Sequence, residues 1–391
     1  MEHYDVAVIG GGPTGATAAH DLARKGRKVL LIDKAGRIKP CGGAVPPKLV
    51  REFEIPESLL AAKVTTARMI SPTGKEVDMP VGGWVGMVDR EVFDEWLRER
   101  AASAGATRAT GQFRRILNDL KEDSVVEYTR KGEVFKVRAK TIIGADGAAS
   151  RVAKDYIPGA KELPNVFAYH EIVETPENPA ENFDGKRCDV FYQGKVSPDF
   201  YGWVFPHGGQ ISVGMGTAHK GFSLRQSVDT LRTAVGLKDA KTVRTEGAPI
   251  PLKTLKRWDN GRNIVVSGDA AGAVAPASGE GIYYAMISGR FAADAADEFL
   301  TSGNPKALKL ARKKFMKLHG RVFFILGMMQ RFWYTTDKRR ERFVSICRDP
   351  DVQRLTWEAY MNKKLVRAKP MAHVRIFFKD LAHLVGLAPN S

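Results

Sequence analysis

The chain has 391 residues, enough for two or three lobes, because a single hydrophobic core stops growing at about 250–300 residues. Its composition is ordinary for a globular protein except in charge, since 61 lysine and arginine residues oppose 44 acidic residues and give a formal net charge of +17. The three cysteines, an odd number lying far apart, exclude a disulfide framework and a paired metal site, and they favour a reducing compartment.

The first predicted elements are a strand, a glycine loop and a helix. An apolar run at residues 6–9 predicts a strand buried on both faces, and residues 16–23 predict the helix. Gly10, Gly12 and Gly15 fit the pattern G-x-G-x-x-G. In this pattern the first glycine allows a tight turn, the second lets the backbone approach a pyrophosphate, and the third lets helix and strand pack closely. The pyrophosphate would bind the free N–H groups at the helix N-terminus.

A second apolar strand, at residues 28–32, ends in Asp33, which lies 18 positions after Gly15. That is about the distance at which an acid accepts a hydrogen bond from an adenosine ribose. Strand, glycines, helix, strand and acid together predict a site for the adenosine diphosphate half of a dinucleotide. The alternative is a glycine-rich turn without a ligand.

The next segments alternate between loops, hairpins and a helix. Residues 39–47 are rich in turn-forming residues, and residues 48–53 predict a short helix. Two runs in which apolar and polar residues alternate, 63–70 and 76–79, are joined by a turn and predict a hairpin. Apolar residues at helical spacing predict a helix over residues 91–104.

The middle of the chain is rich in predicted strands. Residues 108–138 predict a strand and a charged hairpin, and residues 140–143 predict another buried strand, closed by a loop that contains Asp146. The region 165–217 is strand-rich with aromatic residues and glycines, and a helix is expected at 224–235.

The last buried strand is expected at residues 263–267, directly before Gly268 and Asp269. A glycine loop at 278–281 then precedes a long helix that ends near residue 300, and the tail beyond it is helical, basic and aromatic.

Three signatures at predicted strand ends converge on one cofactor. The glycine motif would take the adenosine diphosphate half, and Asp269 would place a carboxylate near the ribityl chain, with the following helix directing its positive end at the flavin. Arg90, at the start of a helix, would reach a phosphate or sugar of the cofactor. A dehydrogenase that uses NAD needs only the first of these signatures, so the set indicates FAD.

Four stretches of the chain match one known family: residues 10–15, 40–43, 198–206 and 268–281. On these stretches the chain resembles the geranylgeranyl reductase family, within the flavoproteins that share the p-hydroxybenzoate hydroxylase fold. Residues 198–206 fit that family's pattern P-x-x-Y-x-W-x-F-P and are the most specific. Residues 365–370 and beyond resemble the chlorophyll and bacteriochlorophyll branch more than the archaeal lipid branch.

The resemblance implies an α/β fold with a Rossmann-type FAD-binding domain, an inserted substrate domain built on an antiparallel sheet, and a C-terminal helical region. We expect the FAD-binding domain at residues 1–62, 88–160 and 255–302, the substrate domain at 63–87 and 161–254, and the basic helical region at 303–391.

The activity that the resemblance implies is the stepwise, NADPH-dependent reduction of three double bonds of a geranylgeranyl chain to give phytyl. This geranylgeranyl chain is attached to chlorophyll, to bacteriochlorophyll or to diphosphate. Other readings are a flavin-dependent monooxygenase or halogenase of an apolar substrate, an archaeal-type prenyl-lipid reductase, and a pigment or lipid carrier with a structural flavin. Gly272 replaces a histidine that hydroxylase relatives often carry, which disfavours the monooxygenase. No second dinucleotide fingerprint exists, so NADPH, NADH and reduced ferredoxin stay open as donors.

Reduction of an isolated alkene needs a proton donor as well as a hydride donor. The resemblance makes Cys41 the first candidate, either as the donor or as a residue that shapes the pocket, although a free cysteine is usually a small buried hydrophobe. Glu280, between two glycines at a helix start, is either a proton relay or a favourable N-terminal carboxylate.

The substrate candidates lie in the aromatic motif. Tyr201, Trp203 and Phe205 alternate, so they would project from one face of a strand. Such aromatic faces are usually plain core, but the match to the family pattern implies that these residues, with Pro206, line the wall of a prenyl tunnel. The expected cofactor-binding residues are Gly10, Gly12, Pro13, Thr14, Gly15, Asp33, Lys34, Cys41, Gly42, Gly43, Ala44, Arg90, Asp146, Gly268, Asp269, Gly279, Gly281 and Ile282.

The C-terminal part carries most of the net charge, because residues 306–391 contain 20 lysine and arginine residues and 6 acidic residues. Basic clusters alternate there with aromatic runs, and the longest apolar run, 322–329, is far too short to span a bilayer. We expect a cytoplasmic protein without a secretory signal that attaches peripherally to an anionic inner or photosynthetic membrane, where it would meet its pigment substrate and chlorophyll synthase. The alternative is a solvated basic cap, and no motif predicts binding to nucleic acid.

Overall fold

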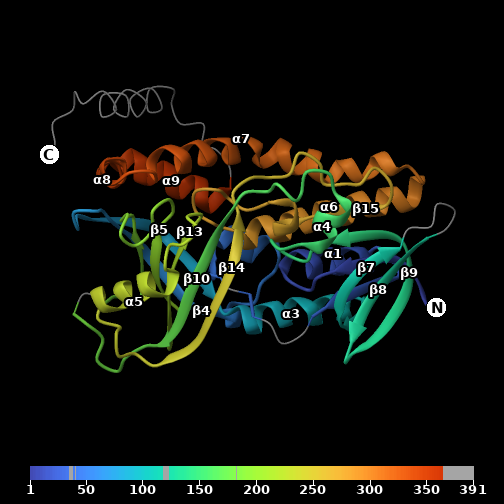
Figure 1. Ribbon diagram of the computed structural model, residues 1–391, viewed down its shortest axis with the longest axis horizontal. Coiled ribbons are helices and arrows are strands. Elements are labelled where there is room, and N and C mark those ends of the chain that lie inside the picture. The colour runs from blue at the N-terminus through green and yellow to red at the C-terminus, as the bar shows by residue number, and fades with distance from the viewer. Residues whose placement is uncertain (35–37, 40, 118–122, 182, 364–391) are drawn as a thin grey trace. The chain divides into compact units, whose positions relative to one another are not determined.

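The computed structural model describes the chain except for residues 35–37, 40, 118–122, 182 and 364–391 (Figure 1). It divides into two compact units, each built from three segments. The first unit comprises Met1–Lys39, Arg90–Asn165 and Ala248–Phe323, and the second comprises Pro40–Asp89, Val166–Gly247 and Phe324–Ser391. Compactness does not test which segments bind a cofactor, so the predicted domain bounds stay a prediction.

A seven-stranded sheet forms the centre of the first unit, in the order β6-β2-β1-β9-β8-β7, with β15 beside β9. Strands β6, β2, β1, β9 and β15 pair in parallel, and β8 and β7 extend the sheet by antiparallel pairing. The strands are β1 His3–Ile9, β2 Val29–Asp33, β6 Thr107–Thr110, β7 Gln112–Leu117, β8 Ser124–Arg130, β9 Glu133–Gly144 and β15 Ile264–Val266.

The helices of the first unit include a closely packed pair, α1 and α6, and α3 also packs against α1. The close approach is possible because α1 faces its neighbours with alanines and other small residues. The helices are α1 Pro13–Arg24, α3 Arg90–Ser103, α4 Arg151–Tyr156, α6 Ile282–Ser302 and the beginning of α7 Lys309–Trp333, with 3₁₀ turns at η2 Gly268–Ala271 and η3 Pro305–Leu308.

One prediction for this unit is wrong. Residues 133–144 form a single strand, β9, rather than the end of a hairpin followed by a separate strand. Its first half pairs with β8 and its second half pairs with β1, so the two halves have different neighbours but one continuous backbone. The short helix α4 was not predicted.

The second unit contains an eight-stranded sheet in the order β14-β10-β13-β12-β11-β4-β5-β3. It is mixed rather than purely antiparallel, because β11 pairs with β4 in parallel. The edge strand β14 was not predicted, since its glycine and prolines are typical of loops and are tolerated only at a sheet edge. The strands are β3 Ala44–Val45, β4 Leu60–Ile70, β5 Glu76–Val88, β10 Asn165–Glu174, β11 Arg187–Phe191, β12 Gly202–Pro206, β13 Gln210–Thr217 and β14 Thr242–Pro251.

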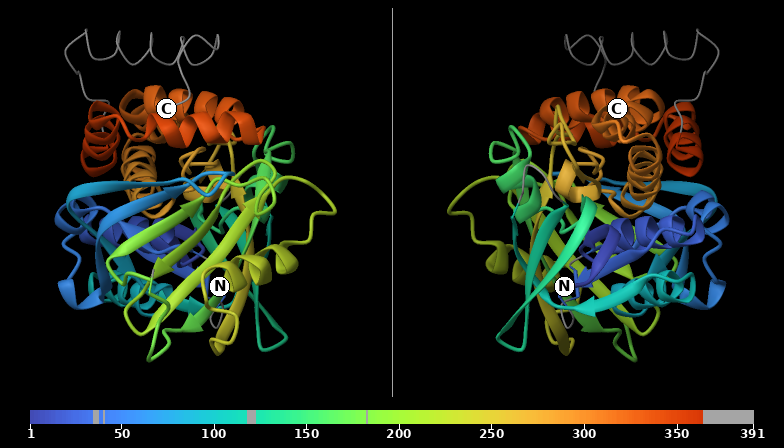
Figure 2. Two further views of the ribbon diagram at one scale, coloured as in Figure 1. Left: turned by 90° about the vertical axis from the view of Figure 1, so that its left-hand side faces the viewer. Right: turned by 90° about the vertical axis from the view of Figure 1, so that its right-hand side faces the viewer.

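One face of this sheet is covered by α5 Leu224–Ala234, whose Val228 and Leu231 pack on Val204 and Val213. Helices α8 Asp337–Ile346 and α9 Pro350–Asn362 pack against β5, and α9 also contacts α2 Pro47–Glu52. In the left view of Figure 2 these orange-red helices lie above the lighter blue strands of the same unit, β4 and β5. A 3₁₀ turn, η1 Glu57–Leu59, precedes β4.

Among the residues described, no helix combines the length and the apolar character needed to cross a bilayer. Residues 365–370, which resemble the chlorophyll branch, lie outside the described residues.

Candidate active site

The glycines between β1 and α1 have different surroundings. Gly10 has φ +106°, and a Cβ atom there would lie 2.3 Å from the carbonyl oxygen of Ala145. A Cβ atom on Gly15 would lie 1.8 Å from the carbonyl oxygen of Gly10. Both glycines are therefore required by the packing of the protein itself, as predicted for a tight turn and a close helix–strand contact.

Gly12 differs because a Cβ atom there would meet nothing within 4 Å. It is the N-cap of α1, has ordinary extended backbone angles, and provides no side-chain cap. The first N–H groups of a helix need acceptors, and an anion is a suitable one. The space and the donors beside Gly12 therefore fit a phosphate group.

Asp33 is the last residue of β2 and is held beside this loop. Its Oδ2 accepts a hydrogen bond of 2.7 Å from the backbone N–H of Gly11. Arg98 of α3, which sequence reasoning missed, donates from Nη1 to the carbonyl oxygen of Gly11 at 3.2 Å and lies 3.8 Å from Asp33 Oδ1. No sequence motif marks Arg98; only the packing of α3 against α1 brings it here. Lys34, the next predicted residue, is exposed.

The predicted late Gly-Asp signature does reach the start of α1. Gly268 has φ +65°, and a Cβ atom there would lie 2.0 Å from Thr14 Oγ1. Asp269 is buried and accepts a hydrogen bond from Lys39 Nζ, a second partner that the sequence did not reveal. A Cβ atom on Gly281 would lie 3.7 Å from Asp269 Oδ1, so the start of α6 lies beside the same carboxylate.

The loop before α6 is well defined by its own hydrogen bonds. The N–H of Ala275 donates to the carbonyl oxygen of Glu280 at 3.0 Å, and Gly279 adopts φ +62°. Helix α6 begins at Ile282 after Gly281, which provides no side-chain cap. Burial, followed by the charge of Glu280, raises the pKa of Tyr284 well above its usual value. The role of Glu280 as a relay stays a prediction.

Two predicted cofactor residues have structural partners within the first unit. Arg90 is buried and forms a two-point ion pair with Asp94, with both N–O distances at 2.7 Å. Asp146 accepts from Ser150 Oγ at 2.5 Å and from the N–H of Arg151 at 2.8 Å, at the start of α4. Burial raises the pKa of Asp146 despite these bonds. Their contact with a cofactor stays a prediction.

In the second unit, the Cys41 loop lies against the aromatic motif. The N–H of Gly43 donates to Cys41 Sγ at 3.3 Å. A Cβ atom on Gly42 would lie 2.9 Å from the Phe205 ring, and one on Gly43, where φ is +72°, would lie 2.5 Å from His207. Glycine at both positions therefore lets this loop touch the strand. Ala44, the next predicted residue, begins β3.

Tyr201, Trp203 and Phe205 project from the same face of the strand region that includes β12, as their alternation predicts. Neighbouring ring centroids are 6.0 and 6.3 Å apart. Val204 points to the opposite face, into the core under α5, and Pro206 ends β12. Tyr201 and Trp203 are themselves buried, and Phe205 packs against a second core cluster of this unit. The aromatic face therefore also belongs to the core, and its role as a tunnel wall stays a prediction.

His207, directly after this motif, is a residue that sequence reasoning missed. The backbone of Gly42 hydrogen-bonds its ring, and Nε2 is buried without a hydrogen-bond partner among the described residues. Burial lowers the pKa of His207 to about 4, with Asp89 opposing the shift. The imidazole is therefore neutral at pH 7. Its place after Pro206 in the motif was the available signal.

Gly272 has a structural reason to be glycine. It adopts φ +70°, and a Cβ atom there would lie 2.0 Å from the carbonyl oxygen of Lys253. A histidine at this position would require the backbone to move, so this chain cannot carry the hydroxylase residue without rearrangement.

Comparisons with known proteins place the chain in a family. Residues 4–188 match the family model described as pyridine nucleotide-disulphide oxidoreductase. The geranylgeranyl diphosphate reductase of Rhodobacter capsulatus is 58% identical over 99% of this chain and 98% of its own. The chloroplastic geranylgeranyl diphosphate reductase of Oryza sativa is 36% identical over 97% of this chain and 86% of its own. The chain belongs to the geranylgeranyl reductase family.

The fold agrees with this assignment. The structure of a geranylgeranyl bacteriochlorophyll reductase-like protein from Thermoplasma acidophilum superimposes with a TM-score of 0.81, covering 99% of this chain and 100% of that one at 24% identity. The predicted family and the predicted α/β fold class, with a second sheet and C-terminal helices, are confirmed.

Proposed function

We propose that this geranylgeranyl reductase binds FAD and uses NADPH to reduce three double bonds of a geranylgeranyl chain to phytyl, in the biosynthesis of chlorophyll or bacteriochlorophyll. The observation that carries the proposal is the full-length match, at 58% identity, to a protein named geranylgeranyl diphosphate reductase. The open space at Gly12 and the approach of Gly268 to Thr14 support a dinucleotide site in the first unit.

Bound FAD, once reduced by NADPH, would supply the hydride for one alkene carbon. The loop at Gly12 and the uncapped starts of α1 and α6 would hold its phosphates and its negative partial charges. Asp33 would face the ribose of the adenosine, held by Gly11 and Arg98. Asp269 would accept from a ribityl hydroxyl, oriented by Lys39.

The neighbouring alkene carbon needs a proton, which we assign to the Cys41 thiol or to a water molecule that it orients. Gly42, next to Cys41, approaches Phe205, which supports a position of this thiol near the aromatic face proposed for the prenyl chain. Apolar aromatic walls exclude bulk water and bind an isoprenoid without competing hydrogen bonds. The collision between a side chain at position 272 and Lys253 argues against the monooxygenase alternative.

The test is mass analysis of the prenyl product after anaerobic incubation with NADPH, with NADH in parallel. Geranylgeranyl diphosphate and geranylgeranylated bacteriochlorophyll are offered separately, and an archaeal-type geranylgeranyl lipid serves as the third substrate. We expect successive gains of two hydrogens on the diphosphate or the pigment. Oxygen uptake coupled to an apolar substrate would support the monooxygenase instead, and an unchanged flavin absorbance would support the carrier.

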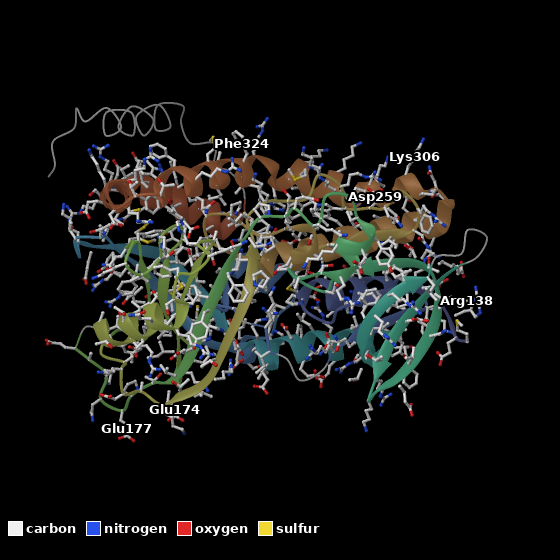
Figure 3. All side chains as sticks on the ribbon, in the orientation of Figure 1. Arg138, Glu174, Glu177, Asp259, Lys306 and Phe324 are labelled. Atoms are coloured by element: carbon white, nitrogen blue, oxygen red, sulfur yellow. The ribbon has the colours of Figure 1, made fainter. Side chains whose placement is uncertain are left out.

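We also propose that the second unit attaches to an anionic membrane, where the chain would meet its pigment substrate and chlorophyll synthase. Its part of α7 exposes two large apolar side chains, Phe324 at 68% and Met328 at 50%, and Phe324 is labelled on the outer side of the helix in Figure 3. Arg331 is also exposed. It lies on the same face of α7 as Phe324 and Met328, because residues 324, 328 and 331 recur at helical spacing.

A basic pocket adjoins this helix end. Lys338 and Arg342 are one turn apart on α8 and have no carboxylate partner among the described residues, and Lys338 lies in the first turn, where the helix dipole disfavours a cation. Anionic headgroups would relieve both effects. The pocket is lined by Phe332, Trp333, Thr335, Thr336, Lys338, Arg339 and Arg342.

A further inference from the structure

A chain of polar side chains lies on the same face of the sheet as the aromatic residues of the second unit. The indole Nε1 of Trp203 donates to Ser212 Oγ at 3.1 Å, and this hydroxyl lies 2.9 Å from His170 Nδ1. His170 Nε2 lies 2.7 Å from Glu246 Oε2. The other oxygen of Glu246 accepts from Arg244 Nε at 3.1 Å. The chain thus crosses four adjacent strands, β12, β13, β10 and β14, of which β10 and β14 run side by side in Figure 1.

The chemistry of the groups gives this chain a direction. An indole N–H can only donate, so Ser212 Oγ is its acceptor. With the carboxylate of Glu246 as acceptor, His170 carries its proton on Nε2, which leaves Nδ1 to accept from the hydroxyl of Ser212. Each member is therefore satisfied in one consistent arrangement, from the carboxylate to the indole.

The indole is also held by the shape of the sheet. A Cβ atom on Gly214 would lie 2.3 Å from Trp203 and 2.5 Å from His170, so the indole and the imidazole share the space above this glycine. The side chains of Ser212 and His170 are 0% and 2% exposed. Burying an imidazole and a carboxylate beside these aromatic rings costs free energy that a hydrophobic residue would avoid. The arrangement is explained if one orientation of Trp203 matters.

The outer end of this polar chain, at Arg244, approaches the Cys41 loop. Arg244 Nη2 lies 3.3 Å from Asp89 Oδ1. Asp89, Arg244 and His170 all act electrostatically on His207, whose ring bonds to Gly42. The same polar chain therefore borders both elements of the proposed substrate site, the aromatic strand and the cysteine loop.

We propose that Ser212, His170 and Glu246 are positioning residues that hold the Trp203 indole in one orientation and thereby set the register of the prenyl chain along the aromatic wall. The inference rests on the proposed function. Three double bonds of one chain must be presented in turn, so a wall of fixed shape decides which of them lies at the reacting position. None of the three residues needs to touch the substrate.

The test compares Ser212→Ala with Ser227→Ala, a matched control. Ser227 is a buried serine of the same unit that donates to Val196 on the α5-covered side. In Ser212→Ala the indole N–H loses its acceptor, and we expect a rise in KM of about five- to tenfold and an accumulation of partly reduced products. FAD content and its reduction by NADPH should equal those of the wild type. The Trp203 indole resonance, assigned by Trp203→Phe in ¹⁵N-tryptophan-labelled protein, should move.

A double-mutant cycle separates positioning from general stability. Ser212→Ala should add nothing to the product distribution of Trp203→Phe, and additive effects would overturn the inference. A wild-type product distribution in Ser212→Ala would also overturn it. If that variant does not fold, Glu246→Gln, which keeps an acceptor but loses the charge facing Arg244, should show a smaller shift in the same direction. A wild-type enzyme that reduces no prenyl chain would instead refute the proposed function, whatever the indole resonance shows.

Discussion

Gly10, Gly12 and Gly15 are alike in the sequence pattern but differ in what surrounds them. Backbone atoms lie within 2.3 Å of the Cβ positions of Gly10 and Gly15, whereas the Cβ position of Gly12 is open. The protein's own packing accounts for two of these glycines and not for the third. The residue that packing leaves unexplained is the one predicted to face a pyrophosphate.

Gly12→Val is therefore expected to fold normally and to lose its FAD. Its extended backbone accepts a β-branched residue, and the added methyl groups would occupy only the space proposed for phosphate. Flavin absorbance per protein and the thermal unfolding midpoint are the measurements. Gly83→Val, at another open and unstrained glycine on β5, is the control and should keep both. Full flavin occupancy in Gly12→Val would show that the assignment is wrong.

The three cysteines should differ in reactivity. Cys41 is half-buried, whereas Cys188 and Cys347 are buried, and burial raises the pKa of Cys347 to about 12. We expect one thiol of the native protein to be alkylated, identified as Cys41 by peptide mass analysis. Cys41→Ser should keep FAD and its reduction by NADPH but slow alkene reduction, by about 10²-fold if the thiol is the general acid.

The control for Cys41→Ser is Cys347→Ser, which removes a thiol of the same unit from buried core. It should leave turnover unchanged in the fraction that folds. Unchanged turnover in Cys41→Ser would remove this residue from the site.

The aromatic strand and the glycine loop beside it form one structural element of the second unit. Phe205 and His207 occupy the space that side chains at positions 42 and 43 would need. The neutral, enclosed His207 holds the loop through Gly42. Enclosure of a group that prefers to be charged in acid makes this contact sensitive to pH.

The stability of the protein should reflect this histidine between pH 6.5 and about 4. In this window an unfolded chain binds a proton at His207, whereas the folded chain does not. The contribution of the neutral His207 to the free energy of unfolding is therefore present above pH 6.5 and is lost as the pH falls. The loss is at most about 3 kcal/mol. Urea unfolding at several pH values should show a weaker acid destabilisation in His207→Gln than in the wild type. His3→Gln, at an exposed site, should follow the wild type, and equal slopes for all three proteins would contradict the prediction.

Charge is unevenly distributed over the whole chain, because residues 306–391 hold 20 basic and 6 acidic residues. Within the described part of the second unit, Lys338 and Arg342 line a pocket next to exposed apolar residues of α7. A lysine or arginine near an anionic bilayer contributes about 1 kcal/mol, so a few such residues give reversible attachment.

Flotation with liposomes should detect this attachment. The wild type should float with anionic vesicles, be released by salt, and stay in solution with neutral vesicles. Lys338→Glu combined with Arg342→Glu should weaken partitioning by roughly tenfold or more. Lys195→Glu with Lys220→Glu changes the charge equally at exposed sites of the same unit and should have little effect. Equal binding to neutral vesicles, or equal losses in both double variants, would defeat the proposal.

The sequence by itself determined the parts whose signal is local. The first strand, the glycine loop, α1 and Asp33 follow one another within 33 residues. Buried strands are recognisable as short apolar runs, whichever segments of the chain pack beside them. The alternation of Tyr201, Trp203 and Phe205 similarly determined that they share a face. The family motifs also predicted the activity and the place of Cys41 in the active site.

Only the tertiary structure decided which distant groups complete these elements. Arg98 lies beside Asp33, and Lys39 donates to Asp269, because helices and loops fold back on the sheet. No regular spacing in the sequence connects such partners. The edge strand β14 was missed because its prolines favour a loop unless a neighbouring strand binds its other edge. The polar chain from Glu246 to Trp203 joins four strands, so it exists only after they pair. Local periodicity specifies which face a side chain occupies, whereas the packing of segments far apart in the chain determines what it contacts there.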